Sequence, residues 1–332
     1  MRQSHITGIG HAVPENVVTN ADLEKLMDTS DQWITERSGV KERHHVRSDE
    51  ETGASDLGVQ AAEIALEMAG VTPDDIDLIV FATISSDYFM PGSAVMVQEK
   101  MGMQHIGAFD VRAACSGFIY GLSIADQFIR TEMHDNVLLI GAEVQSVALK
   151  LDTEHRDLAV LFGDGAGAVV LQPSHDDAGV LSTHLHSDGS HLKDLWLPAP
   201  GSKYNPFNSK ELIDKDLHVP YMNGREVFKN AVVRFPEVIH EALDHNGLTL
   251  NDVALIIPHQ ANYRISQAVA KRLGVGMDRV YSNIHKYGNT TAASIPIAMS
   301  EAYADGKISS GDIVILAAFG SGFTWASAAI RW

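Results

Sequence analysis

The chain has 332 residues, 45% of them hydrophobic, and a formal net charge of −18 at pH 7, so it can bury one large core or two modest ones. The acidic balance argues against nucleic acid as the main ligand, because phosphate contacts require a concentrated basic surface. The single cysteine excludes an intrachain disulfide and a cysteine-rich zinc site, and there is neither a signal-peptide pattern nor an apolar run of the ~20 residues that a membrane span needs, so we expect a cytoplasmic protein without a membrane span.

The first half of the chain alternates strands and helices. Apolar residues at helical spacing predict helices over 20–27, 55–69, 92–101 and 115–130. Short apolar runs predict buried strands over 6–10, 77–82, 106–111, 136–141, 159–162 and 166–171. Strands that alternate with helices are typical of an α/β protein with a buried, largely parallel sheet.

The second half repeats the first. Helices are expected over 225–246, 265–273 and 292–304, and strands over 252–257, 280–283 and 312–317. Ile79 and Leu138 are separated by 59 residues, as are Ile256 and Ile315 in the equivalent strands. An offset of 177 residues therefore relates the halves and places Cys115 opposite Ala292. We predict an internal duplication, with halves at 1–172 and 173–332 that form one compact catalytic unit.

A long segment with weak periodicity, 187–222, lies between the halves. Such insertions in compact proteins are usually functional or mobile.

Cys115 is expected where the strand over 106–111 turns into a helix. Phe118, Leu122, Ala125 and Ile129 recur at helical spacing after it. Unpaired N–H groups and the helix dipole at a helix N-terminus favour an anion, so we expect the thiolate to form easily. An isolated cysteine is more often a buried structural residue, and only the other features of the chain favour a nucleophile.

Further polar and glycine-rich segments follow other predicted strands. His259 follows the strand over 252–257, Asn289 precedes the helix over 292–304, and 318–325 is a glycine loop whose N–H groups could face an oxyanion. Alone, each has a structural explanation: a satisfied polar residue, a helix cap and a tight turn. Because all fall at strand ends related by the duplication, we expect them to meet Cys115 at one central site.

Taken together, these motifs resemble the thiolase-like superfamily, and specifically β-ketoacyl-acyl-carrier-protein synthase III, over essentially the whole chain. The resemblance rests on segments 29–34, 114–117, 162–166, 226–229, 258–262, 288–290 and 319–325. It implies duplicated α/β halves in a layered α-β-α-β-α architecture. It also implies a catalytic triad of Cys115, His259 and Asn289.

The implied reaction is a decarboxylative Claisen condensation that initiates fatty acid synthesis. Cys115 would attack an acyl-CoA thioester to give an S-acyl enzyme. Malonyl-acyl carrier protein would then lose carbon dioxide, and His259 and Asn289 would stabilise its enolate. Backbone N–H groups of Cys115 and Ser321 would hold the acylation oxyanion, although the family often has glycine at position 321, which leaves the loop freer. Both acyl-CoA and malonyl-acyl carrier protein are substrates, so no cofactor and no metal is implied.

The resemblance also assigns binding residues. Trp33 and Arg37 would sandwich and face the CoA adenine, Arg156 would lie near the CoA phosphates, and Asn262 would contact the pantetheine. Carrier-protein docking is assigned to Lys229 and Arg264, with Arg225 nearby where the family often has asparagine. The implied homodimer would bring Met90, or its neighbour Phe89 after a register shift, into the partner's acyl channel, although Met90 could equally fill the dimer core.

Several alternatives remain to be weighed against this interpretation. A thiolase needs a second cysteine, a hydroxymethylglutaryl-CoA synthase needs a glutamate upstream of the nucleophile, and a chalcone-synthase-like enzyme is usually longer. The closest rival is a synthase-III-like acyltransferase of a specialised polyketide or secondary-metabolite pathway, with another donor or acceptor. The glycines of 163–167 could suggest dinucleotide binding, but a predicted strand follows them where that motif requires a helix. His184 and His186 could suggest a metal module, but they lack carboxylates at helical spacing.

Overall fold

Two mixed β-sheets, one from each half of the chain, form the framework of the computed structural model, which describes residues 2–174 and 177–332. The first sheet has the order β1-β7-β6-β4-β5, with β1 (Gln3–Ala12), β4 (Leu78–Ala82), β5 (Gly107–Val111), β6 (Val137–Glu143) and β7 (Gly165–Ser174). The second has the order β11-β12-β13-β8, with β8 (Gly179–Ser187), β11 (Val253–Pro258), β12 (Ile313–Gly320) and β13 (Thr324–Arg331).

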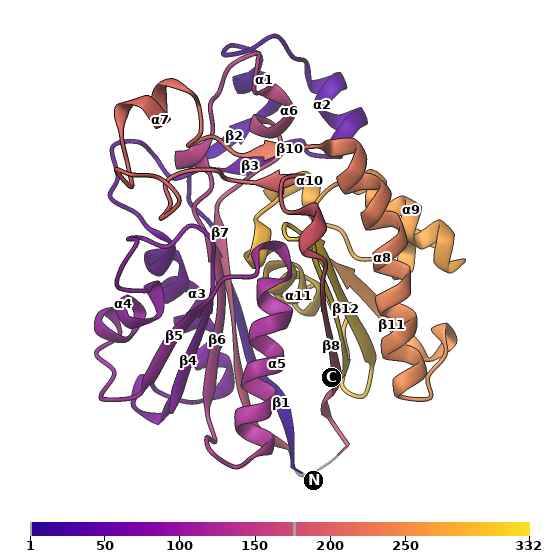
Figure 1. Cartoon of the computed structure of the whole chain (residues 1–332). Coiled ribbons are helices and arrows are strands. Elements are labelled where there is room, and N and C mark those ends of the chain that lie inside the picture. The colour runs from indigo at the N-terminus through magenta and orange to yellow at the C-terminus, as the bar shows by residue number, and fades with distance from the viewer. Residues whose placement is uncertain (1, 175–176) are drawn as a thin grey trace.

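Helices lie between the two sheets and on their outer faces (Figure 1). The central helices α5 (Gly117–Arg130) and α11 (Ser294–Ala304) share one apolar core with the inner faces of both sheets. Helices α3 (Ala54–Ala69) and α4 (Ser93–Lys100) cover the outer face of the first sheet, and α8 (Gly224–His245) and α9 (Tyr263–Leu273) cover that of the second. The layered α-β-α-β-α architecture is therefore confirmed.

The internal repeat is visible in the elements themselves. The 3₁₀ turns η1 (Pro73–Asp75) and η5 (Leu250–Asp252) differ by 177 residues, as do η2 (Ala114–Ser116) and η7 (Thr291–Ala293). Even the backbone agrees, because Ala114 and Thr291 both adopt left-handed φ values, 45° and 48°. This conformation is uncommon for residues other than glycine, so the two turns have the same unusual shape. The boundary between the halves at 172/173 stays a prediction.

Some predicted elements are wrong. The sheets are mixed and not largely parallel: β4 is parallel to β5 and β6, and β11 to β12, whereas β1, β7, β8 and β13 pair antiparallel. No strand covers 159–162, because α6 (Arg156–Ala159) ends there and Phe162 makes only an isolated bridge. At 280–283, Val280 alone forms a bridge. Short apolar runs do not distinguish strands from other buried segments, which explains both errors.

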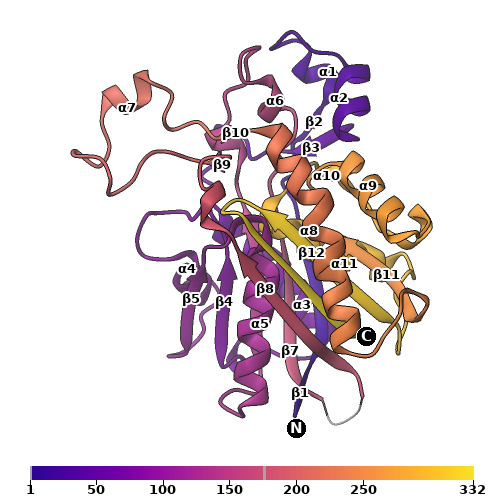
Figure 2. The same ribbon diagram turned by 45° about the vertical axis from the view of Figure 1, so that its right-hand side comes forward.

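Smaller elements cap one end of the two sheets and join the halves. The cap contains β2 (Val17–Thr19), α1 (Asn20–Leu23), α2 (Asp31–Ser38), β3 (Glu42–His44) and α10 (Ile284–Tyr287). The joining segment contains β9 (Leu195–Trp196), α7 (Lys210–Asp214) and β10 (Tyr221–Met222), and Figure 2 shows α7 projecting from the body. Further 3₁₀ turns are η3 (Ser146–Ala148), η4 (Gly189–His191) and η6 (Met277–Arg279). Within the described ranges, none of the helices combines the length and the apolar character that crossing a bilayer requires.

Candidate active site

Cys115 lies in η2, at the junction between strand β5 and helix α5, and is 7% exposed. A residue from the second half of the chain holds this turn in place, because the Thr324 hydroxyl lies 3.2 Å from Ser116 Oγ. Backbone N–H groups of Cys115 and Ser321 both face the sulfur and lower the pKa of the thiol. Ser321 does not adopt a positive φ, which falls on Gly322 (137°) instead, so the loop accommodates a serine at 321. The pair of donors can hold an oxyanion next to the sulfur.

The surroundings of Cys115 raise the pKa of its thiol to about 12. Burial is the largest cause and the Glu143 carboxylate adds to it, whereas the two N–H donors lower the pKa by less. The prediction that the helix N-terminus makes the thiolate easy to form is therefore wrong for the free protein, because burial outweighs it. Cys115 is a thiol at neutral pH and must lose its proton as it attacks.

His259 follows strand β11 and is 2% exposed. Its Nδ1 lies 2.6 Å from Ser294 Oγ, and the same hydroxyl accepts a hydrogen bond from the Gln260 backbone N–H at 3.3 Å. This arrangement favours donation from Ser294 to Nδ1, which places the ring proton on Nε2. In the described part of the chain, the buried Nε2 has no partner. Burial lowers the pKa of His259 to about 3, so the ring is a neutral donor at pH 7.

Asn289 is held by its backbone on both sides. Its N–H donates to the Leu161 carbonyl at 2.8 Å, and its carbonyl accepts from the Gly163 N–H at 3.1 Å. The side-chain oxygen accepts from the Thr291 N–H at 2.9 Å. That bond occupies the acceptor of the amide and leaves Nδ2 available as a donor.

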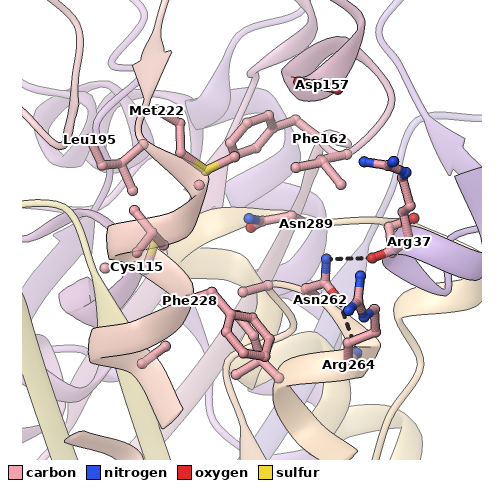
Figure 3. Close-up of a pocket in the computed structure, with 18 of the residues that line it drawn as sticks. Arg37, Cys115, Asp157, Phe162, Leu195, Met222, Phe228, Asn262, Arg264 and Asn289 are labelled. Carbon is pink, nitrogen blue, oxygen red and sulfur yellow. Dashed lines mark hydrogen bonds between the residues drawn. The ribbon is translucent and has the colours of Figure 1, made fainter. Parts of the chain in front are cut away.

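Two cavities meet at Cys115. The first, of about 460 Å³, is also lined by His259 and Asn289, so the structure brings the three predicted catalytic residues together from both halves. Figure 3 shows Cys115 and Asn289 in this cavity. The second, of about 570 Å³, is lined by Cys115 and by Phe89 among other, mostly apolar residues. A group bound in one cavity and a group bound in the other can therefore both reach the sulfur.

Of the predicted CoA residues, Arg37 and Asn262 lie on the side of the first cavity away from Cys115 (Figure 3). The guanidinium carbons of Arg37 and Arg156 lie 4.7 and 5.0 Å from the Trp33 ring centroid. Arg37, Trp33 and Asn262 line the cavity, whereas Arg156 does not. Asn262 Nδ2 donates to the Arg37 carbonyl at 2.9 Å, which joins helix α9 to helix α2.

The three predicted docking cations lie near the start of helices α8 and α9, which pack against each other. Arg225 and Arg264 line the first cavity. The Lys229 side chain is 71% exposed and lies 3.4 Å from Glu226, one turn earlier on α8.

Phe89 and Met90 are 70% and 78% exposed in the single chain. Phe89 lines the second cavity and meets the Phe207 ring edge-on at 4.8 Å. Met90 lines neither cavity, so its reach into a partner subunit stays a prediction.

Sequence reasoning missed two residues that support the site, Ser294 behind His259 and Glu143 near Cys115. The 177-residue offset was the available signal, because it places Ser294 opposite Gly117 and Glu143 opposite Gly320.

In the alternative metal site, His186 Nε2 lies 2.6 Å from Glu241 Oε2, and His184 shares that carboxylate at 3.4 Å. Over residues 2–174 and 177–332, no group of three or more such side chains is arranged to hold a metal ion.

Comparisons with known proteins agree along the whole chain. A family model described as 3-oxoacyl-[acyl-carrier-protein (ACP)] synthase III matches residues 109–189, and the model of its C-terminal part matches residues 243–332. The chain is 47% identical to the β-ketoacyl-[acyl-carrier-protein] synthase III of Caldanaerobacter subterraneus, over 98% of this chain and 97% of that protein.

Solved structures give the same result. The 3-oxoacyl-[acyl-carrier-protein] synthase III of Aquifex aeolicus is 42% identical, with a TM-score of 0.90, and the match covers 99% of this chain and 100% of that one. The priming β-ketosynthase of the R1128 polyketide pathway has the same TM-score of 0.90 but is 32% identical, over 99% of this chain and 96% of that one.

Proposed function

The chain belongs to the β-ketoacyl-[acyl-carrier-protein] synthase III family, and we propose that it condenses an acyl-CoA primer with malonyl-acyl carrier protein to initiate fatty acid synthesis. One observation carries the proposal: Cys115, His259 and Asn289 line one cavity although they come from different halves of the chain. Primary metabolism is favoured over a specialised polyketide pathway, because full-length synthase III relatives are 47% identical and the polyketide priming enzyme is 32% identical.

In the acylation step, Cys115 Sγ attacks the thioester carbonyl of acyl-CoA. The carbonyl oxygen becomes negative and accepts hydrogen bonds from the N–H groups of Cys115 and Ser321. The C–S bond to CoA then breaks, and the thiol proton ends on the departing CoA sulfur. Because the thiol is neutral at rest, bond formation and proton loss are coupled.

In the condensation step, malonyl-acyl carrier protein loses carbon dioxide, and its thioester oxygen becomes an enolate. His259 Nε2–H and Asn289 Nδ2–H are the two donors available to this oxygen. The enolate carbon attacks the acyl carbonyl on Cys115. The C–S bond to Cys115 then breaks, the sulfur takes up a proton, and the 3-oxoacyl product leaves on the carrier protein. The reaction draws on no cofactor.

We assign the first cavity to the pantetheine arm and the second to the acyl chain. Both groups have to reach Cys115 Sγ, and the two cavities meet there. Adenine would stack on Trp33 by displacing one of the two guanidinium groups that now lie on that ring. A guanidinium group would then cover the other face of the adenine and complete the sandwich. The acidic carrier protein would dock on Arg225, Lys229 and Arg264. We further propose a homodimer in the cytoplasm, with Met90 or Phe89 closing the partner's acyl channel.

Intact-mass measurement of the purified protein tests the proposal directly. Incubation with acyl-CoA should add one acyl group, and Cys115→Ala should block the addition, because the chain has a single cysteine. Addition of malonyl-acyl carrier protein labelled in its free carboxyl group should then release labelled carbon dioxide and the 3-oxoacyl carrier protein. Acyl loading without carbon dioxide release would contradict the condensing function and favour a simple acyltransferase.

A further inference from the structure

Glu143, the last residue of strand β6, carries a carboxylate that the proposed mechanism does not use. It is fully buried and lines neither cavity. The carboxylate accepts hydrogen bonds from the Thr83 hydroxyl at 3.2 Å, the Ser85 hydroxyl at 2.5 Å and the Ile84 N–H at 3.2 Å. The Ala292 N–H faces this carboxylate across the interface between the halves and helps to lower its pKa. Because so many donors surround this buried carboxylate, it occupies a preformed anion-binding site.

The internal repeat explains the location of that site. Turn η7 is the counterpart of η2, so Ala292 corresponds to Cys115 and Glu143 corresponds to Gly320. In η2 the N–H of Cys115 faces the reacting sulfur and is left open to a substrate oxyanion. In η7 the equivalent N–H, that of Ala292, faces the Glu143 carboxylate.

The second donor of the pair is matched as well. The N–H of Ser321 completes the donor pair at Cys115, and Val144 is its counterpart. The Val144 N–H donates to the Ser85 hydroxyl at 2.8 Å, and that hydroxyl donates in turn to Glu143. Glu143 thus satisfies both N–H groups of this second donor pair, that of Ala292 directly and that of Val144 through Ser85.

Building on the proposed function, we propose that Glu143 is a positioning residue of the condensation. Its carboxylate permanently fills the second oxyanion-type site, the one formed by the N–H groups of Ala292 and Val144. It thereby holds the turn that carries Asn289 and places a negative charge beside Cys115.

The effect on Asn289 follows from the turn. Asn289 Oδ1 is bonded to the Thr291 N–H at 2.9 Å, and Thr291 has the left-handed φ of 48°. The next N–H in the chain, that of Ala292, is the one bound to Glu143. The turn also lies tightly on β6, because a Cβ at Gly141 would come within 2.6 Å of the Ala292 carbonyl oxygen. Loss of the carboxylate would leave a strained turn without its anchor, and the Asn289 amide would lose its orientation.

The effect on Cys115 is electrostatic. Glu143 raises the pKa of the thiol, and burial raises the pKa of Glu143 itself to about 7 against the donors that lower it. The other titratable groups that line the two cavities are His259, Arg37, Asp157, Arg225 and Arg264 in the first and Asp87, Tyr88 and Arg112 in the second. Of these, His259 is neutral. Above pH 7 the charge of Glu143 therefore adds to burial, the larger cause, in disfavouring the thiolate of Cys115.

Alkylation by iodoacetamide tests the electrostatic part, since the only thiol of the chain is Cys115. Glu143→Gln removes the charge and should speed alkylation. The ratio of the mutant rate to the wild-type rate should be near one at pH 6, where Glu143 is largely protonated, and approach about tenfold at pH 8, where about one Glu143 in ten is neutral. A purely structural role would change the rate without this pH dependence.

Separate assays of the two half-reactions test the positioning part. Glu143→Gln should reduce malonyl decarboxylation at least about tenfold more than acyl loading, because Asn289 acts only in the former. Glu143→Asp keeps the charge but shortens the reach to Ala292. It should therefore keep the wild-type alkylation profile and still lose decarboxylation. If Glu143→Gln fails to fold, this separation in Glu143→Asp carries the test.

Asp126→Asn is the matched control, because Asp126 is also a buried carboxylate, 2% exposed, and it lines neither cavity. It should change neither the alkylation profile nor the balance of the half-reactions. The proposal is overturned if Glu143→Gln behaves like Asp126→Asn in either assay. A wild-type protein that does not condense would instead refute the proposed function, and the alkylation assay would still be readable.

Discussion

Gly320 of strand β12 lies directly against Cys115. A Cβ built at position 320 would come within 2.4 Å of Cys115 Cβ and 2.6 Å of Sγ, far inside any real carbon–sulfur contact. Because both residues belong to buried backbone segments, neither can move aside without disturbing the N–H pair at the sulfur. The absence of a side chain at 320 is therefore a condition for the nucleophile to occupy its place.

We expect Gly320→Ala to abolish acyl loading, measured by intact mass after incubation with acyl-CoA. Overpacking of this kind should also lower the free energy of unfolding by roughly 1–3 kcal/mol. Gly189→Ala is the control, because a Cβ there would meet nothing within 4 Å and its φ is not in the left-handed region. Normal loading by Gly320→Ala would mean that η2 can shift freely.

The three triad residues should act in different half-reactions, Cys115 in acyl loading and His259 and Asn289 in decarboxylation. Cys115→Ser and Cys115→Ala should abolish acyl loading. His259→Ala and Asn289→Ala should still load acyl groups but lose decarboxylation by on the order of 100-fold, the usual cost of removing one oxyanion donor. Asn246→Ala, whose amide bonds to Ser182 and Ala242, serves as the control. Near wild-type condensation by either His259→Ala or Asn289→Ala would remove that residue from enolate stabilisation.

Burial of neutral His259 should make the fold sensitive to acid. The pKa of His259 is about 3 in the folded chain, against 6.5 for an unperturbed histidine, so only the unfolded chain takes up the proton as pH falls through 6.5. Stability should therefore be lost below pH 6.5, and His259→Gln should escape this loss. Between pH 7.5 and 5, unfolding free energies should shift by about 2 kcal/mol in favour of the variant. Parallel pH dependences would mean that His259 is not a buried neutral ring.

Carrier-protein docking should depend on Lys229. Lys229→Glu should raise the KM for malonyl-acyl carrier protein, with a stronger effect at low salt, and leave acylation by acyl-CoA nearly unchanged. Lys25→Glu is a matched control, because Lys25 is 72% exposed and, like Lys229, pairs with an acidic residue three positions earlier. Equal damage to both half-reactions, or an equal effect of Lys25→Glu, would exclude this surface.

The acyl channel should accept chains longer than acetyl. Met90 is flexible and unbranched, and each CH₂ buried beyond it would add up to about 0.8 kcal/mol of binding until the channel ends. Acylation rates with acetyl-, butyryl-, octanoyl- and dodecanoyl-CoA measure this, and Met90→Phe should shift the preference toward the shortest primers. Phe89→Ala examines the neighbour that lines the second cavity. A wild-type preference for acetyl-CoA with rejection of octanoyl-CoA would exclude a long channel.

Much of the fold follows from local pattern. The runs at β4, β11 and β12 are apolar throughout, and β6 is apolar up to its last residue, Glu143. The 177-residue repeat of these runs predicted two related halves. Strands β8 and β13 were not predicted, and neither was their antiparallel pairing. Pairing direction depends on which strands become neighbours, and residues close in sequence do not encode it.

The amino-acid sequence by itself determined the residue types and their placement at strand ends: one cysteine before a helix, with histidine, asparagine and a glycine loop at related positions. Only the tertiary structure decided their electrostatic state. Cys115 is a thiol and not a thiolate, because burial and Glu143 outweigh the helix terminus. The physical reason is that turn geometry and periodicity depend on a few adjacent residues, whereas desolvation and charge–charge interaction depend on groups that only folding brings together, here β6, η2 and η7 from opposite halves of the chain.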